Sequence, residues 1–212
     1  MFASPVFDNR RDAAEKLAEL LLPYRGRKPL VLAIPRGAVP MAKIIADRLG
    51  GEVDVVLARK LGAPYSPEYA IGAIVENGWV YLSPESALSG ISPAYIKQEK
   101  AKQLDTIRQR RKQYTPLRNP VDPRGRVVII VDDGLATGAT MIAALHAIRS
   151  QNPAELVCAV PVAAPDSLEK VRPLADAVAC AYAPPHFRAV GQFYRDFKQV
   201  EDEEVERILS AA

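Results

Sequence analysis

Two adjacent carboxylates and a turn of small residues are the groups most suited to chemistry in this 212-residue chain. Asp132 and Asp133 follow the apolar run 127–131, and a helical pattern begins after the turn 136–140. Open α/β sheets bind ligands outside the carboxyl ends of their strands. Backbone N–H groups and threonine hydroxyls of such a turn suit a phosphate, whereas carboxylates suit sugar hydroxyls or hydrated Mg²⁺. The stretch therefore predicts a site for a phosphorylated sugar.

Three other interpretations of this stretch have to be weighed. A strand that ends in Asp-Asp could be a Walker B element, but no G-x-x-x-x-G-K-[ST] motif precedes it. A dinucleotide site requires G-x-G-x-x-G, which the sequence lacks. An ordinary helix cap needs neither two acids nor two threonines. The phosphorylated sugar is favoured over all three.

A second loop carries an arginine in a position to bind an anion. Arg36 lies between Pro35 and Gly37, again after an apolar run and before a helical pattern. At a helix start, a guanidinium and backbone N–H groups can hold one anion together. A plain connection with a surface arginine is the alternative, and the presence of the sugar-phosphate pattern in the same chain makes that alternative less favourable.

The segment Val128–Thr140 resembles the phosphoribosyl diphosphate (PRPP) binding motif of type I phosphoribosyltransferases. It has four apolar residues, two acids, a short turn and then Thr-Gly-x-Thr. The order of the parts extends the resemblance over about residues 28–182, with overall similarity to predicted bacterial phosphoribosyltransferases of unassigned base. Ala136 stands where 6-oxopurine transferases typically carry an aspartate, so Leu-Ala-Thr-Gly is more similar to adenine phosphoribosyltransferases.

The resemblance implies a role for each loop. Asp132 and Asp133 would hold the ribose hydroxyls. Mg²⁺ would arrive with PRPP, and Asp132 or Asp133 is the candidate ligand. The 5′-phosphate would bind to Ala136, Thr137, Gly138, Ala139 and Thr140. The pyrophosphate would bind to Pro35, Arg36 and Gly37, with a cis peptide expected before Arg36, and also to Arg59 and Lys60.

Two further groups are candidates for the acceptor side. Glu68 lies in the loop 61–69, which resembles the mobile loop of adenine phosphoribosyltransferases, and is a candidate for proton transfer; a surface glutamate is the alternative. Phe187, Phe193 and Tyr194 could stack on a planar base, with core aromatics as the alternative. The implied activity is Mg²⁺-assisted transfer of 5-phosphoribosyl from PRPP to a nucleobase-like acceptor, by a homodimer, through an oxocarbenium-like state.

The elements that must position these residues alternate between strands and helices. Short Val- and Ile-rich runs at 31–34, 53–58, 127–131, 156–160 and 177–182 read as strands, and helical patterns cover about 9–22, 38–49, 138–150 and 165–172. The run 127–131 has no polar alternation, which is typical of a parallel strand covered on both faces. We therefore expect an α/β, doubly wound, mainly parallel sheet in one domain over 1–212.

Two segments interrupt this alternation. Residues 61–125 hold strand-like runs around an Asn77-Gly78 hairpin signal and a long polar helix over about 93–114, and are predicted to be an inserted flap. Residues 184–212 are rich in aromatic residues and are predicted to be a C-terminal lid segment.

Composition limits the remaining possibilities. No apolar run reaches the roughly 18–20 residues of a membrane helix, no secretory signal is visible, and two cysteines suggest a reducing compartment, so a cytoplasmic protein is expected. Residues 97–118 contain eight Lys or Arg against two acids. A regulator of the same fold that senses PRPP or nucleotides and binds nucleic acid through residues 97–118 is one rival hypothesis, although nucleic acid is not the expected partner. A Mg²⁺-dependent sugar-phosphate hydrolase is the other.

Overall fold

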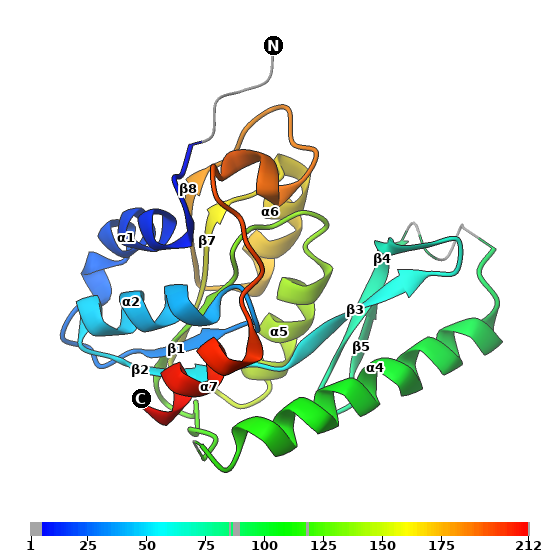
Figure 1. Ribbon diagram of the computed structural model, residues 1–212, viewed down its shortest axis with the longest axis horizontal. Helices are drawn as coiled ribbons and strands as arrows, with labels where there is room; N and C mark the ends of the chain where they lie inside the picture. Colours follow the sequence, from blue (N-terminus) through cyan, green and yellow to red (C-terminus); the bar gives the residue numbers. More distant parts are fainter. Residues whose placement is uncertain (1–5, 85, 87–89, 118, 212) are drawn as a thin grey trace.

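Five of the apolar runs form the parallel strands of one sheet (Figure 1). The computed structural model describes residues 6–84, 86, 90–117 and 119–211. The sheet order is β2-β1-β6-β7-β8, with bounds β1 (Leu30–Ala33), β2 (Glu52–Val55), β6 (Val127–Val131), β7 (Glu155–Val162) and β8 (Ala177–Tyr182). The predicted α/β fold with a mainly parallel sheet is confirmed. The run 53–58 is divided, because the chain leaves this sheet after Val55 and enters another at Ala58.

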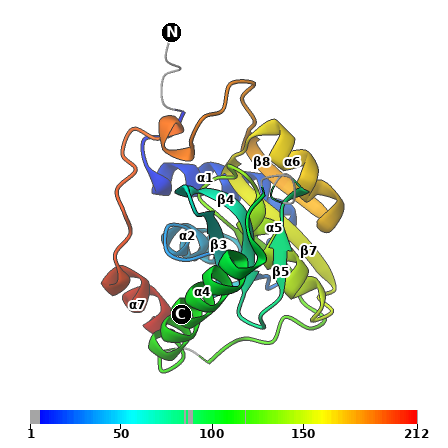
Figure 2. The same cartoon turned by 90° about the vertical axis from the view of Figure 1, so that its right-hand side faces the viewer.

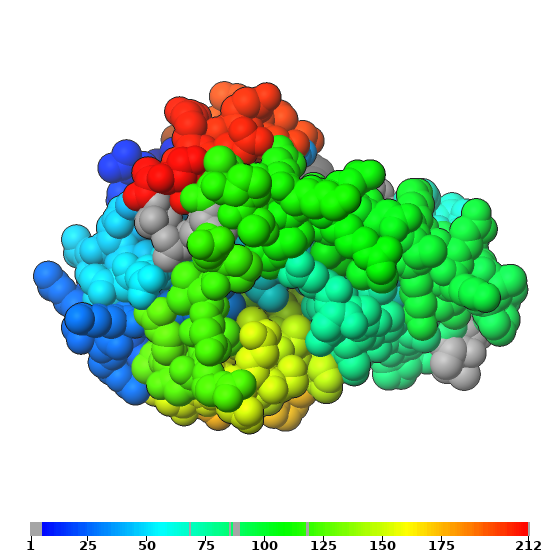
Figure 3. All heavy atoms as spheres, turned by 90° about the horizontal axis from the view of Figure 1, so that it is seen from below, coloured from blue at the N-terminus to red at the C-terminus, as the bar shows by residue number. Residues whose placement is uncertain are grey.

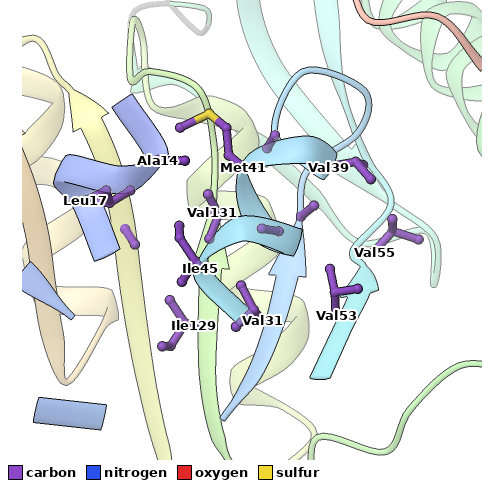
Figure 4. Packing of buried hydrophobic residues seen from close by; sticks show 14 of the residues in the cluster. Ala14, Leu17, Val31, Val39, Met41, Ile45, Val53, Val55, Ile129 and Val131 are labelled. Atoms are coloured by element: carbon purple, nitrogen blue, oxygen red, sulfur yellow. The ribbon is translucent and has the colours of Figure 1, made fainter. Parts of the chain in front are cut away.

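Helices cover both faces of this sheet. One face carries α1 (Arg10–Leu20) and α2 (Val39–Leu49), and the other carries α5 (Ala139–Arg149) and α6 (Pro165–Val171). Successive strand residues point to opposite faces, so Val31 and Ile129 pack with Ile45 of α2 (Figure 4), whereas Leu32 and Ile130 pack in the cluster of α5. Both faces of β6 are buried, which accounts for its unbroken apolar sequence.

A small antiparallel sheet and a long helix form a second layer, here called the hood (residues 58–114). Its strands are β3 (Ala58–Ala63), β4 (Ser66–Val75) and β5 (Val80–Leu82), and its helix is α4 (Pro93–Tyr114). Gly78 has φ 85° in the turn between β4 and β5, a conformation that favours glycine. Figures 1 and 2 show the hood extending to one side of the core, with α4 lying along its strands.

The hood contacts α5 through an aromatic stack. The ring of Trp79 lies 3.7 Å from the ring of His146, measured between centroids, with 15° between the planes. Trp79 is the only tryptophan of the chain, so its fluorescence reports on this contact between the hood and the core.

Replacing His146 by alanine should remove this stack and lower the free energy of unfolding by about 0.5–1 kcal/mol. We expect the Trp79 emission maximum to move to longer wavelength, because the indole gains contact with water. Urea unfolding followed by fluorescence measures both changes. His186, the other histidine, is exposed, so His186→Ala is the matched control and should change neither quantity; an unchanged spectrum in His146→Ala would contradict the prediction.

Residues 6–7 lie beside residues 193–195. The Phe7 N–H donates to the Phe193 carbonyl at 2.9 Å, and the Arg195 N–H donates to the Phe7 carbonyl at 2.9 Å. Farther along, α7 (Asp202–Ser210) lies beside α2 and buries Val205. Three short 3₁₀ helices complete the fold: η1 (Leu22–Tyr24), η2 (Arg172–Leu174) and η3 (Val190–Phe193). Within the described ranges, no helix combines the length and the apolar character needed to span a membrane.

Candidate functional site

Strand register brings the two predicted loops together. Ala33, the last residue of β1, pairs with Val131, the last residue of β6, in parallel. The loop that contains Arg36 and the acid pair therefore leave the sheet at the same edge. The peptide bond between Pro35 and Arg36 is cis, which confirms the expectation for this loop.

The two loops are in direct contact at Gly37 and Asp133. A Cβ atom added to Gly37 would overlap the Oδ2 atom of Asp133 and would lie 3.2 Å from the Nε atom of Arg10. The backbone of one loop thus packs on the carboxylate of the other, and glycine is the residue that permits this approach.

The acid pair is largely shielded from water. Asp132 accepts a 2.9 Å hydrogen bond at Oδ1 from the Asp133 N–H, and Asp133 pairs through Oδ2 with Arg10. Burial raises the pKa of Asp132 well above its usual value, and the neighbouring charge of Asp133 raises it further. Burial also raises the pKa of Asp133, although Arg10 opposes this shift.

The turn after the acid pair is fixed to the sheet and to α6. The Leu135 N–H donates to the Val162 carbonyl at 2.9 Å, and the Ser167 hydroxyl donates to the Ala136 carbonyl at 2.5 Å. Gly138 has φ 80° and immediately precedes α5. The first N–H groups of a helix have no partner within it, so this fixed turn presents donors and a positive helix end to an anion.

The turn lines a cavity of about 430 Å³. The motif contributes Asp132 and residues 134–141 to its lining. The hood contributes Lys60 and Ala70, and the C-terminal segment contributes Arg188, Ala189 and Val190. Val190 packs on the motif itself, because a Cβ at Gly134 would lie 2.5 Å from its Cγ1 atom. Hood, motif and C-terminal segment therefore enclose one space.

The two adjacent cations of β3 point in different directions. Lys60 lines the cavity, whereas Arg59 donates from Nε to the Gln103 side chain of α4 at 3.0 Å. This follows from the alternation of side chains along a strand. Burial lowers the pKa of Arg59, and the nearby cations Arg110 and Arg36 lower it further. Arg59 therefore lies on the Arg36 side of the hood.

Arg36 is held by the C-terminal helix. Its Nη1 atom lies 3.0 Å from the Asp202 carboxylate and 3.8 Å from the Glu201 carboxylate. Two negative side chains at the start of α7 thus occupy the guanidinium of the predicted pyrophosphate loop.

The aromatic candidates lie beside the cavity lining rather than within it. Phe193 and Tyr194 are buried, and Phe193 packs against Phe187 and Tyr182, with ring centroids 5.3 Å and 5.8 Å away. The Tyr194 hydroxyl donates to the Asp133 carbonyl at 2.6 Å. These rings therefore pack next to the site residues without lining the cavity. Glu68 falls within β4, and its side chain lies outside the described part of the chain.

Two residues at the site have no sequence signal of their own. Arg10 is one of two adjacent arginines in the first helix, and their types cannot show which one faces Asp133. Val190 is an ordinary apolar residue in a segment without periodicity. The one feature of the motif that relates to Val190 is Gly134, whose lack of a side chain leaves room for it.

A second cavity, of about 570 Å³, lies between the hood and the core. Figure 3 shows the surface hollowed there, between the linker that follows α4 and the end of α5. Its lining includes Asp54 and the pair Glu76–Arg111. The Asp54 carboxylate accepts from the Val121 N–H at 2.9 Å, so it fixes the linker. The cavity at the motif is smaller, but its lining includes Asp132 and the phosphate turn.

The acid pair has the right chemistry for magnesium. Among the described side chains, no three of the His, Cys, Asp and Glu type gather around one point, so a closed metal cage is not built into this part of the chain. Mg²⁺ commonly binds through one or two carboxylates together with substrate phosphates. Asp132 and Asp133 provide carboxylate oxygens at the same sheet edge as the phosphate turn, so these residues fit an ion that arrives with a phosphorylated ligand.

Comparison with known proteins gives consistent results. A model of the family "Phosphoribosyl transferase domain" matches residues 5–198. Two Mycobacterium tuberculosis proteins, "Putative phosphoribosyl transferase Rv0571c" (strain ATCC 25618 / H37Rv) and "Putative phosphoribosyl transferase MT0597" (strain CDC 1551 / Oshkosh), are each 39% identical over 209 residues. The match covers 98% of this chain and 47% of theirs, so the chain spans about half the length of these relatives.

Solved structures extend the comparison. The crystal structure of TT1426 from Thermus thermophilus is 45% identical, with a TM-score of 0.80 over 97% of this chain and 98% of that one. AQ2163 of Aquifex aeolicus is 13% identical with a TM-score of 0.52, over 86% of this chain and 78% of that one, and shares the fold.

Proposed function

Since the chain belongs to the phosphoribosyl transferase domain family, we propose that it transfers 5-phosphoribosyl from PRPP to a nitrogenous acceptor and releases pyrophosphate. The observation that carries this proposal is the contact of Gly37 with Asp133 at one sheet edge. It joins an arginine loop, an acid pair and a phosphate turn into a single site. A phosphorylated sugar with a second anionic group is the kind of ligand that all three parts can bind together.

Each part of PRPP has a counterpart in this chain. The 5-phosphate binds to the turn 136–140 at the start of α5, through N–H groups and the hydroxyls of Thr137 and Thr140. The ribose hydroxyls donate to the carboxylates of Asp132 and Asp133. The diphosphate binds to Arg36, whose guanidinium can hold two of its oxygens. Arg59 of the hood lies close enough to Arg36 to add a second positive charge on this side.

The reaction exchanges two bonds at C1 of the ribose. The C1–O bond to the diphosphate breaks with its electron pair on the leaving oxygen, the C1–N bond to the acceptor forms, and the acceptor nitrogen gives its proton to the departing diphosphate. Bound at Asp132 and Asp133, Mg²⁺ would neutralise charge on the diphosphate. The chain contributes position and positive charge at the leaving group, while Lys60 and Val190 enclose the cavity against water that would otherwise react with the sugar cation.

Calorimetric titration with PRPP and Mg²⁺ tests the binding half of this proposal. We expect Asp133→Asn and Thr137→Ala each to weaken PRPP binding roughly 10- to 100-fold, because each removes a hydrogen bond to a charged group. Asp105→Asn and Thr106→Ala, both in α4 and outside the cavity lining, are the matched controls and should bind PRPP normally. Unchanged affinity in both site variants would remove the acid pair and the turn from the binding site.

Pyrophosphate release with a panel of nucleobases and related heterocycles tests the transfer half. Release only in the presence of one acceptor supports the proposal and identifies the acceptor. Release without any acceptor would instead establish a sugar-phosphate hydrolase. PRPP binding without release under any condition would establish a sensor of the same fold.

A further inference from the structure

The carboxylate of Asp133 is held by a residue far away in sequence. Arg10, the first residue of α1, donates from Nε and from Nη2 to Oδ2 of Asp133, at 2.9 Å and 2.8 Å. The two side chains are 14% and 18% exposed. A shielded pair with two hydrogen bonds to one charged oxygen has a fixed geometry, unlike an exposed ion pair.

Arg10 is itself fixed by the C-terminal segment. Its Nη1 atom donates to the Lys198 carbonyl at 2.5 Å, and its guanidinium carbon lies 3.9 Å from the centre of the Phe197 ring. Phe197 stacks on Tyr194 at 4.7 Å between centroids, and the Tyr194 hydroxyl bonds to the Asp133 carbonyl. The side chain and the backbone of Asp133 are therefore held by one connected cluster.

We propose that Arg10 is a positioning residue for the ribose of PRPP, and this inference rests on the proposed function. Each of the three guanidinium nitrogens of Arg10 donates to a protein acceptor, so its role is to orient Asp133 rather than to contact the substrate. Both bonds to the carboxylate fall on Oδ2. This opposes rotation of the carboxylate and leaves Oδ1 as the oxygen available for a ribose hydroxyl.

Gly37 of the Arg36 loop packs on the same carboxylate that Arg10 holds. The Oδ2 atom of Asp133 lies between the Arg10 guanidinium and the Gly37 backbone. A carboxylate released by Arg10 could turn away from the ribose. Displacing a binding group by about 1 Å can cost a factor of about 100 in rate, so the pair fixes the orientation on which binding of the ribose half of PRPP depends.

Substitutions at Arg10 test the inference, with Arg11 as the matched control. Arg11 is 79% exposed and pairs with Glu15 on the surface, so Arg11→Ala should change nothing. We expect Arg10→Ala to bind ribose 5-phosphate and PRPP at least 10-fold more weakly than the unchanged chain in calorimetry. Binding of inorganic pyrophosphate, which has no ribose, should stay within twofold.

Guanidinium chloride at low millimolar concentration should restore part of the ribose 5-phosphate affinity of Arg10→Ala, because it can occupy the vacated position beneath Phe197. Arg10→Lys keeps the positive charge but cannot donate from two nitrogens to the Oδ2 atom, so a loss of binding with a native circular dichroism spectrum is expected there as well. If Arg10→Ala fails to fold, Arg10→Lys decides the question.

Three results would overturn the inference: normal ribose 5-phosphate affinity in either variant, equal losses for ribose 5-phosphate and pyrophosphate, or no restoration by guanidinium in folded Arg10→Ala. Failure of the proposed function has a different signature, because the unchanged chain would then not bind PRPP, or would bind it without acceptor-dependent release of pyrophosphate.

Discussion

Replacing Gly37 by alanine should reduce phosphoribosyl transfer by a factor of about 100 or more. The added Cβ would overlap the Oδ2 atom of Asp133 and press on the Nε atom of Arg10. Neither loop can yield easily, because Ala38 and Val39, which follow Gly37, are completely buried. The methyl group must therefore displace the carboxylate from the position in which we propose that it binds ribose.

Steady-state rates and PRPP calorimetry measure this effect, and a glycine at the other end of α2 provides the control. Gly50 has φ 68° and caps α2, with nothing near its hypothetical Cβ. Gly50→Ala should lower stability by about 1–2 kcal/mol through backbone strain and leave PRPP affinity unchanged. If Gly37→Ala kept both normal rate and normal affinity, the contact between the two loops would have no functional importance.

Replacing Arg36 by glutamine should lower the rate by a factor of about 100–1,000, the usual consequence of removing one donor that stabilises charge in a transition state. The diphosphate leaves with additional negative charge, and Arg36 is the cation of the loop that we propose to bind it. We expect the loss to appear mainly in the maximal rate and in pyrophosphate affinity. The affinity for ribose 5-phosphate, which has no diphosphate, should be nearly normal.

Removing the negative charge at the start of α7 should have the opposite effect on pyrophosphate affinity from that of removing Arg36. The carboxylate of Asp202 lies 3.0 Å from Arg36 and is 42% exposed, so PRPP has to displace a modest, partly screened interaction. Asp202→Asn should therefore tighten pyrophosphate binding by up to about fivefold. Glu203→Gln, an exposed change in the same helical turn, should leave affinity unchanged. Weaker binding in Asp202→Asn would show that Asp202 orients Arg36 instead of competing for it.

Much of the fold could be predicted because its signals are local. The run 127–131 is apolar throughout because both faces of the strand that it forms are buried. The turn between β4 and β5 follows from Asn77-Gly78. The end of β2 was less predictable, since the apolar run 53–58 continues across the point where the chain changes sheets.

The site could be predicted only where its residues lie in one motif. The alternation of side chains in a strand could have separated Lys60 from Arg59, since these two residues face the cavity and α4, respectively. Arg10 was beyond reach, because its partner Asp133 lies 123 residues away and an arginine at a helix start is ordinary on any surface. Long-range pairs of this kind depend on the fold and leave no trace in local pattern.

The joining of the first and last described segments has a consequence for the order of synthesis. A ribosome produces the arginine loop and the acid pair well before residues 193–198, which hydrogen-bond to Phe7 and hold Arg10. Until those residues have been synthesised, the Arg36 loop and the turn 136–140 are present, but Arg10 does not yet hold the Asp133 carboxylate in one orientation. If the proposed function holds, we therefore expect a partly synthesised chain to bind PRPP more weakly than the folded chain, because Asp133 is not yet held by Arg10 and residues 197–198.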